Sequence, residues 1–206
     1  MRERPRAILF DLDGVLIDSY AVWFQLLNHT ARKLGYGEIS RDMYRESWGQ
    51  STLADRDRFF PRHSVADVER FYQEHYFEHL EHLVVPPEVP EVFRWLREER
   101  IATAVVTNTQ KALAASIVEK AGATPDVVVG GGDAPLGKPA PDSLLLASRL
   151  LNVPPEEAWM VGDTGFDREA ARAAGIWFVG VGIEGDLRVE GVAGILDLIE
   201  LSGDSR

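Results

Sequence analysis

The chain has 206 residues, 45% of them hydrophobic and 27% charged, which is typical of a soluble globular protein with one core and room for an insertion. Cysteine is absent, and this excludes disulfide bonds and thiolate metal sites. The net charge of −11 argues against a nucleic-acid partner, because binding to a phosphate backbone requires a basic surface.

The first predicted element is residues 6–13, RAILFDLD, a short apolar run that ends in acids and is typical of a buried strand. The apolar part is too short for a signal peptide, and no run in the chain approaches the length of a membrane span. We therefore expect a cytoplasmic protein with no membrane partner.

The stretch from about Tyr20 to Leu83 has no buried-strand pattern and predicts several helices. Two of them are clear: Tyr20–Gly35, which is amphipathic and ends at glycine, and Ser64–Leu83. The proline-rich segment Val84–Pro90 then predicts a stiff return linker.

Four more apolar runs predict buried strands: residues 101–108, 126–131, 158–163 and 177–182. Helical patterns lie between them, at residues 111–122, 142–153 and 168–175. This alternation indicates an α/β fold, a doubly wound, Rossmann-like parallel sheet covered on both faces. We expect residues 1–18 and 85–206 to form this core, and residues 19–84 to form a helical cap inserted after the first strand.

Polar side chains follow four of the predicted strands. Ligands of open α/β sheets bind beyond the carboxyl ends of the strands, so we expect the site there. The candidates in chain order are Asp11 and Asp13, then Thr107 and Asn108, then Lys138 in a loop, and finally Asp163 and Asp167.

These residue types fit phosphoryl transfer. Asp11 can act as a carboxylate nucleophile that forms an acyl phosphate, and Asp13 can protonate the leaving oxygen and later activate water. Magnesium prefers oxygen ligands, and Asp11 and Asp163 are its natural side-chain ligands here. Thr107 can hydrogen-bond a phosphate oxygen, and Lys138, one of only four lysines, can neutralise the transferring charge.

Taken together and in order, these motifs resemble those of the haloacid dehalogenase-like hydrolase superfamily. They are FDLDGVLIDS at 10–19, VVTNT at 105–109, GKPAPD at 137–142 and VGDTGFD at 161–167. The helical insertion is similar to the cap of the subgroup that includes phosphoglycolate phosphatase and β-phosphoglucomutase. The dehalogenases lack the second aspartate of the first motif, so the presence of Asp13 points to phosphate chemistry.

The resemblance implies that Asp11 is the nucleophile and Asp13 the general acid and base. It implies Mg²⁺ held by the side chains of Asp11 and Asp163 and by the backbone carbonyl of Asp13. Thr107 and Lys138, with Asn108 beside them, would bind the phosphoryl group. Asp167 would support either the metal or Lys138.

The cap is where the sequence predicts substrate choice. The segment 45–51, RESWGQS, resembles a glycine-containing loop that family caps lower into the site, or else it is an ordinary turn between helices. Arg45, Gln50 and Ser51 are the candidate substrate contacts. His75, His79 and His82 fall on one helical stripe, which can bind zinc or can simply be a polar flank of the cap.

Several functions remain open at this stage. The first is a phosphatase acting on a small-molecule phosphate ester such as phosphoglycolate, a sugar phosphate, a nucleotide or pyrophosphate. A phosphomutase of the β-phosphoglucomutase type is disfavoured, because Trp23 stands where such mutases usually carry histidine. A non-catalytic binding protein would be free to lose motif residues, and hydrolysis of a phosphonate would need Lys33, the only lysine of the cap. The oligomeric state is not predicted.

Overall fold

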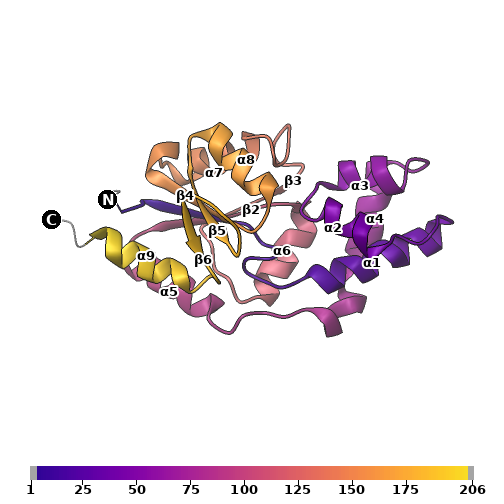
Figure 1. Cartoon of the computed structure of the whole chain (residues 1–206), viewed down its shortest axis with the longest axis horizontal. Coiled ribbons are helices and arrows are strands. Elements are labelled where there is room, and N and C mark those ends of the chain that lie inside the picture. Colours follow the sequence, from indigo (N-terminus) through magenta and orange to yellow (C-terminus); the bar gives the residue numbers. More distant parts are fainter. Residues whose placement is uncertain (1–3, 204–206) are drawn as a thin grey trace.

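The computed structural model describes residues 4–203, which form an all-parallel sheet with helices on both faces (Figure 1). The strand order within this range is β3-β2-β1-β4-β5-β6. The strands are β1 (Ala7–Phe10), β2 (Ala102–Gln110), β3 (Val127–Gly131), β4 (Ala158–Gly162), β5 (Trp177–Val181) and β6 (Leu187–Val189). The predicted α/β, Rossmann-like fold class is confirmed.

Successive side chains of each strand point to opposite faces of the sheet, and this divides the core into two layers. On β1, Ile8 and Phe10 pack into the larger apolar cluster, while Ala7 and Leu9 pack into the smaller one on the opposite face. The larger cluster continues into the helices between residues 20 and 82. Beside the sheet, it takes helical residues from α5 (Val89–Glu98), α6 (Lys111–Lys120) and α9 (Gly194–Gly203). The smaller one takes them from α7 (Asp142–Leu151) and α8 (Gly165–Ala174), and the short helix η2 (Pro155–Glu157) precedes β4.

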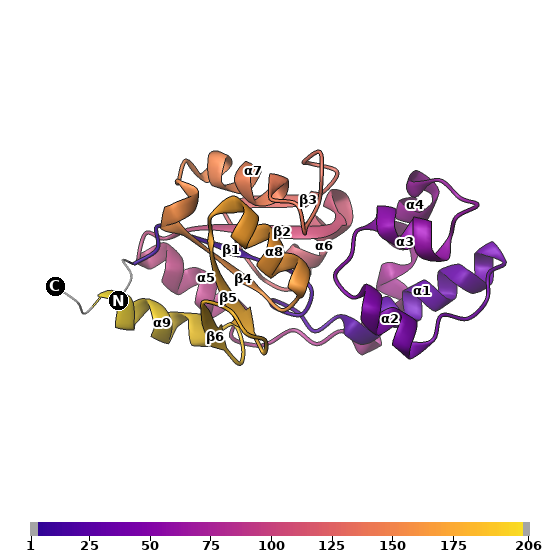
Figure 2. The ribbon, with the colours of Figure 1, turned by 45° about the horizontal axis from the view of Figure 1, so that its top comes forward.

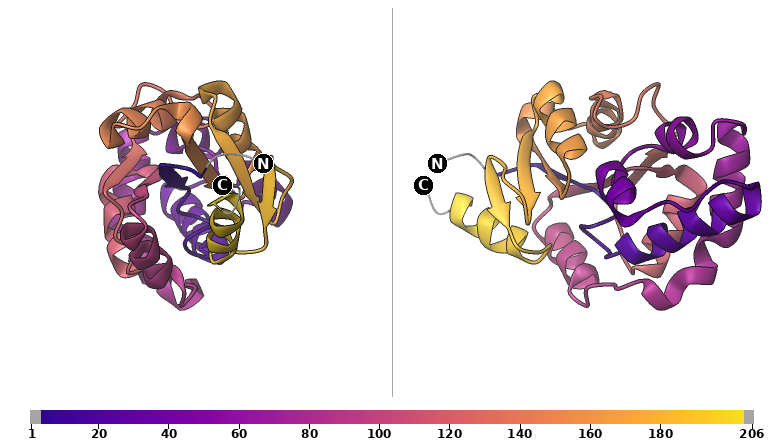
Figure 3. Two further views of the ribbon diagram at one scale, coloured as in Figure 1. Left: turned by 90° about the vertical axis from the view of Figure 1, so that its left-hand side faces the viewer. Right: turned by 45° about the vertical axis from the view of Figure 1, so that its right-hand side comes forward.

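A group of helices, residues 20–82, lies apart from the sheet at the end of the molecule opposite α9, and we call it the helical insert (Figures 2 and 3). It comprises α1 (Tyr20–Leu34), α2 (Arg41–Ser47), α3 (Thr52–Phe59), α4 (Val65–His75) and η1 (Tyr76–His82). Its entering and leaving segments pair at Asp18 and Val84, whose backbones exchange hydrogen bonds of 2.8 and 3.0 Å. This antiparallel bridge between the two connecting segments ties the insert to the core next to β1.

Serines set the starts of the insert's shorter helices. Ser40, Ser51 and Ser64 each accept a hydrogen bond from the backbone N–H three residues on, which satisfies one free donor of the first turn. Ser64 forms a reciprocal capping box with Asp67. Local sequence therefore fixes where α2, α3 and α4 begin.

Four details differ from the sequence-based expectation. Residues 64–83 do not form one helix: α4 ends at His75, and non-helical dihedral angles at His79 interrupt the following 3₁₀ turns. Arg45 belongs to the end of α2 rather than to a loop. The return linker is shorter than predicted, because α5 already begins at Val89 with a proline in its first turn, a favoured position. The strand β6 was not predicted, since its three residues are too short for a recognisable pattern.

Within residues 4–203, no helix combines the length and the apolar character that a bilayer crossing requires.

Candidate active site

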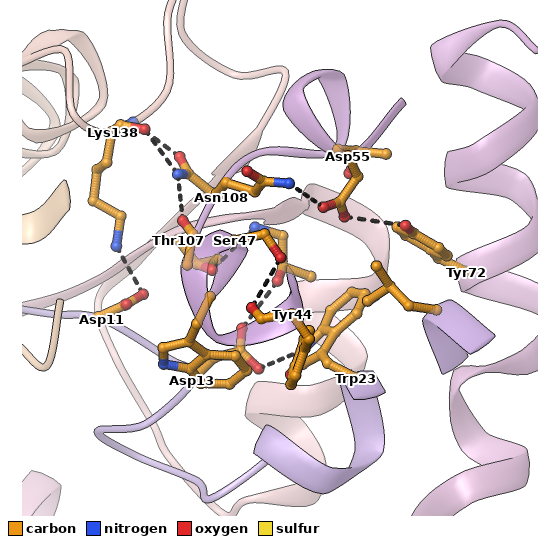
Figure 4. A pocket seen from close by; sticks show the side chains of 16 residues that line it. Asp11, Asp13, Trp23, Tyr44, Ser47, Asp55, Tyr72, Thr107, Asn108 and Lys138 are labelled. Atoms are coloured by element: carbon orange, nitrogen blue, oxygen red, sulfur yellow. Dashed lines mark hydrogen bonds and ion pairs between the residues drawn. The ribbon is translucent and has the colours of Figure 1, made fainter. Parts of the chain in front are cut away.

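The carboxyl ends of β1, β2 and β4, which are neighbours in the sheet, bring most of the candidate residues together. Asp11 follows β1 directly, and its backbone N–H continues the pairing with β4 by bonding to Val161. Thr107 and Asn108 lie near the end of β2, where the pairing with β3 shifts register. These side chains, with Asp13 and Lys138, line one pocket between the core and the helical insert (Figure 4).

Lys138 is the central charge of this pocket and is almost fully buried, at 3% exposure. Its ammonium lies 2.8 Å from Asp11 Oδ1, 2.6 Å from Asp167 Oδ1 and 3.0 Å from the carbonyl oxygen of Val106. Burial alone would lower the pKa of Lys138, but attraction to Asp11 and Asp167 raises it above its ordinary value. The lysine therefore stays charged, with all three of its protons matched to acceptors.

Asp167 pairs with Lys138 and also stabilises the first turn of α8. Its Oδ2 accepts hydrogen bonds from the backbone N–H of Thr164 at 3.0 Å and from the Thr164 hydroxyl at 2.6 Å, as part of a capping box. Its other oxygen accepts from Lys138. Of the two roles left open by the sequence, the geometry favours support of Lys138, because both oxygens of Asp167 are already committed.

Asn108 holds the loop that carries Lys138. Its Oδ1 accepts from the Lys138 backbone N–H and its Nδ2 donates to the Lys138 carbonyl, both at 2.9 Å. The same amide donates to the carbonyl of Gly49 in the helical insert at 2.9 Å. A side chain at Gly137 would approach Asn108 Oδ1 to 2.5 Å, which explains the glycine before the lysine. The amide of Asn108 thus positions Lys138 and also anchors the insert.

Asp13 is held by three donors from three parts of the chain. Its Oδ1 accepts from the Ser19 hydroxyl at 2.5 Å and from the Trp23 indole at 2.8 Å, and its Oδ2 accepts from the Thr109 hydroxyl at 3.0 Å. The carboxylate is therefore fixed in the pocket beside Asp11. Thr107 also lines the pocket, and its hydroxyl accepts from the backbone N–H of Thr109.

Asp11 and Asp163 have the chemistry of a divalent cation site. Carboxylate oxygens of Asp11, Asp163 and Asp167 lie within 4.8 Å of one another. Asp163 Oδ1 is buried and has no hydrogen-bond partner in the described chain, while its Oδ2 accepts from the Trp48 indole at 3.0 Å. A side chain at Gly14, whose φ is +82°, would come within 2.1 Å of Asp163, so only glycine lets the Asp11–Asp13 turn approach this carboxylate.

Burial and repulsion between neighbouring carboxylates disfavour the ionised forms of Asp11 and Asp163. Burial, and after it the negative charge of Asp167, raises the pKa of Asp11 well above its ordinary value, although the positive charge of Lys138 opposes the rise. Burial also raises the pKa of Asp163 to about 6, against the hydrogen bond from Trp48. Clustered buried carboxylates that one lysine does not neutralise fit a hard, oxygen-preferring cation such as magnesium.

The three candidate contacts of the helical insert are placed differently. Gln50 lines the pocket and donates to Asp55 Oδ1 at 2.6 Å. Arg45 lies outside that pocket, pairs with the exposed Asp42 and borders a separate hollow beside Asp163. Ser51 is also outside the pocket, and its hydroxyl instead caps the start of α3 by accepting from the Ala54 backbone N–H. The structure brings Gln50 alone of the three to the pocket beside Asp11.

The sequence analysis did not predict the polar residues by which the insert lines its side of the pocket. Asp55 is buried and accepts hydrogen bonds from Gln50 and, at 3.0 Å, from the Tyr72 hydroxyl (Figure 4). In the sequence Asp55 stands in the charged run ADRDR, which resembles a solvated helix face and carries no signal of burial. Trp48, which reaches Asp163, was likewise unassigned.

Comparison with known proteins decides the family. The family model described as "Haloacid dehalogenase-like hydrolase" matches residues 8–181. The chain belongs to this family. The matched range of this haloacid dehalogenase-like hydrolase includes the whole helical insert and every candidate residue above.

Individual relatives of the hydrolase agree with the family. It is 31% identical to a phosphoglycolate phosphatase of Chromobacterium violaceum, over 95% of this chain and 96% of that protein. It is 36% identical to a protein of Caldanaerobacter subterraneus named "Putative pyrophosphatase PpaX", over 85% of this chain and 80% of that protein. A β-phosphoglucomutase structure from Clostridium difficile, 19% identical, covers 96% of each chain with a TM-score of 0.83 and shows the shared fold. The predictions of this family and of an enzyme of the phosphatase class are confirmed.

Asp55 gives the hydrolase a testable pH dependence of stability. Burial raises the pKa of Asp55 to about 7, against hydrogen bonds from Gln50 and Tyr72 that lower it. The folded chain therefore holds a proton between about pH 4 and pH 7 that the unfolded chain releases, so this residue's contribution to stability falls as pH rises through that window. The full effect is at most about 4 kcal/mol.

We expect Asp55→Asn to remove this fall, since an amide does not ionise. Urea unfolding at pH 5 and pH 8 should show the variant gaining stability relative to wild type at the higher pH. Asp57→Asn, a change at an exposed neighbour, is the matched control and should leave the pH dependence intact. An Asp55→Asn variant with the wild-type pH dependence would show that Asp55 titrates normally.

Proposed function

We propose that this protein is a Mg²⁺-dependent phosphatase that hydrolyses a small-molecule phosphate monoester through a phosphoryl-Asp11 intermediate. One observation carries the proposal: Asp11, at a strand end, is paired through one oxygen with the buried Lys138, while the neighbouring Asp163 has a buried oxygen without a partner. Carboxylate oxygens of Asp11 and Asp163 lie within 4.8 Å of each other, so a candidate nucleophile, a charge-neutralising lysine and candidate cation ligands are neighbours. Magnesium, when bound by Asp11, Asp163 and the backbone carbonyl of Asp13, would supply charge stabilisation to the transferring phosphoryl group.

The hydrogen bonds of Asp11 and Asp13 support a choice of reacting oxygens. Asp11 Oδ1 accepts from Lys138 and from the Leu12 backbone N–H at 2.7 Å, so we assign the attack on phosphorus to Oδ2. The bond from phosphorus to the ester oxygen breaks, and Asp13 gives a proton to the leaving alcohol. Asp13 then takes a proton from water, whose oxygen attacks the phosphorus and releases phosphate and free Asp11.

We assign this proton transfer to Asp13 Oδ2, because Oδ1 accepts two hydrogen bonds, from Ser19 and Trp23, whereas within residues 4–203 Oδ2 accepts only one, from Thr109. Thr107 would hold a phosphoryl oxygen, Lys138 would neutralise the phosphoryl charge from beside Asp11, and Asn108 would act through the loop of Lys138. Trp23 also bears on the phosphomutase alternative. Its indole nitrogen is a donor only and cannot exchange protons with a sugar hydroxyl as a histidine can.

The leaving-group end of the pocket supports an uncharged or cationic alcohol. It is lined from the insert by aromatic and neutral polar residues and by Asp55, and Lys138 is the only lysine or arginine among the lining residues of the described chain. A leaving group with hydroxyl or amino donors would bond to Asp55 or Gln50. A carboxylate such as that of glycolate would face Asp55, and Lys138, the one cation among the described lining residues, is already paired with Asp11 and Asp167.

The test is phosphate release from a panel of monoesters, with magnesium and after exhaustive treatment with EDTA. We expect turnover only with magnesium, and higher kcat/KM for glycerol or sugar phosphates than for phosphoglycolate. Phosphorus NMR on the glucose phosphates should show phosphate and no isomerised sugar phosphate. Full activity after metal removal would refute the cation site, and isomerisation faster than phosphate release would identify a mutase.

A further inference from the structure

Three imidazoles and one carboxylate meet on the helical insert, away from the residues that line the catalytic pocket. His29 comes from α1, His75 ends α4, and Glu78 and His79 lie in η1. None of the four lines the pocket that contains Asp11. The catalytic proposal gives these residues no role.

The ligand atoms of this cluster lie close together. His75 Nδ1 is 2.8 Å from Glu78 Oε1, His29 Nδ1 is 3.3 Å from His79 Nε2, and His29 Nδ1 is 3.9 Å from the other oxygen of Glu78. Atoms of His29, His75 and Glu78 all fall within 4.8 Å of one another. A tetrahedral zinc ion with bonds of about 2.0–2.1 Å separates its ligands by about 3.3 Å, so small side-chain rotations would complete the coordination.

The interruption of the helical path at His79, within η1, accompanies this grouping. In a continuous helix, His75, His79 and His82 would form one stripe, as the sequence predicted. Instead, the interruption leaves His79 beside His29 of α1, and His82 lies outside the cluster, next to Glu81. The residue that joins two of the three predicted histidines is therefore His29, 46 positions before His75, and no spacing rule indicates it.

The surroundings hold the rings in place. Phe71 packs against His75 with ring centroids 4.2 Å apart and against His29 at 5.4 Å. An apolar wall of this kind orients imidazole ligands and limits access of water. His29 is only 16% exposed, whereas Glu78 is 54% exposed, so an ion could enter from the Glu78 side.

We propose that His29, His75, Glu78 and His79 bind one transition-metal ion of the zinc class, which would clamp α1 to the junction of α4 and η1. Imidazole and carboxylate ligands in a roughly tetrahedral arrangement suit Zn²⁺ rather than Mg²⁺. The nearby positive charges Arg32 and Lys33 weaken the binding of a cation, and Glu78 and Glu81 favour it. The alternative is a hydrogen-bonded histidine cluster without an ion.

The experiment uses the full chain stripped of transition metals, in excess Mg²⁺ that would occupy the acidic site, and titrates Zn²⁺ by calorimetry. We expect one Zn²⁺ per chain, a Kd raised at least about tenfold in His29→Ala and in His75→Ala, and an unchanged Kd in the control His82→Ala. Zn²⁺ should raise the unfolding temperature of the wild type and of His82→Ala, but not that of His29→Ala. Circular dichroism establishes that each variant is folded.

Binding that survives in both cluster variants, or no binding by the wild type, would overturn the proposal. So would Zn²⁺ binding that is lost in Asp163→Ala and kept in His75→Ala, because the ion would then occupy the catalytic acids. The readouts are affinity and unfolding temperature rather than phosphatase activity. Failure here therefore leaves the catalytic proposal standing.

Discussion

Replacing Asp11 with asparagine is expected to reduce turnover by about four orders of magnitude or more, because a carboxamide cannot form an acyl phosphate. The fold should survive. Asparagine keeps an oxygen that can accept from the Leu12 N–H and from Lys138, and the substitution removes one charge from a crowded set of acids. The pKa of Asp11 is raised by burial and by Asp167, which is the mark of a carboxylate whose ionised form is disfavoured in the metal-free state.

The measurement is kcat for the best ester of the panel, alongside urea unfolding of the same samples. Asp42→Asn is the matched control: it makes the same chemical change at an exposed residue outside the pocket, and it should leave both quantities near wild type. An Asp11→Asn enzyme that works at near the wild-type rate would remove Asp11 from the role of nucleophile.

Replacing Lys138 with methionine is expected to have the largest effect on stability. Methionine is similar in length but brings no charge, so Asp11 and Asp167 would remain buried without their shared partner. Breaking a buried ion pair from one side costs about 3–5 kcal/mol. Turnover should also collapse, because the phosphoryl charge loses its neutralising group.

The loss of unfolding free energy should be larger at pH 8 than at pH 5. Burial already raises the pKa of Asp11, and Lys138 opposes that rise. Without Lys138, the Asp11 carboxyl of the folded state holds its proton to still higher pH than in the unfolded chain, so stability falls as pH rises. Lys111→Met is the control, since Lys111 is exposed and its pair with Asp133 is worth about 1 kcal/mol or less. Equal stability of Lys138→Met and wild type at both pH values would mean that the buried pairs are not formed in solution.

The core of this fold could be predicted because its signals are local. Continuous apolar runs gave the first five strands to within a few residues at each end, and glycine marked the end of α1, where Gly35 adopts the left-handed conformation. The parallel arrangement then placed Asp11, Thr107 and Asp163 at neighbouring strand ends without further information. These inferences need only periodicity and the topology of an α/β sheet.

The insert side of the pocket could not be predicted, because its groups depend on contacts between distant segments. The burial of Asp55 follows from the packing of α3 against α4, which brings it to Tyr72, and a charged helical stretch does not reveal such packing. The bonds from Trp23 to Asp13 and from Trp48 to Asp163 join residues of the insert to the core. Likewise, Arg45 and Ser51 are within a few residues of the pocket in sequence, but helix geometry turns them elsewhere.

The most direct test of the account is to trap the intermediate. A rapid-quench reaction with substrate labelled in its phosphoryl group, stopped with acid and followed by peptide mapping, measures label bound covalently to the protein. We predict transient label on the peptide that contains Asp11, lost on treatment with alkali or hydroxylamine and absent from Asp11→Asn. Release of phosphate at the full rate with no label on that peptide at any time would contradict the central claim that Asp11 carries the phosphoryl group.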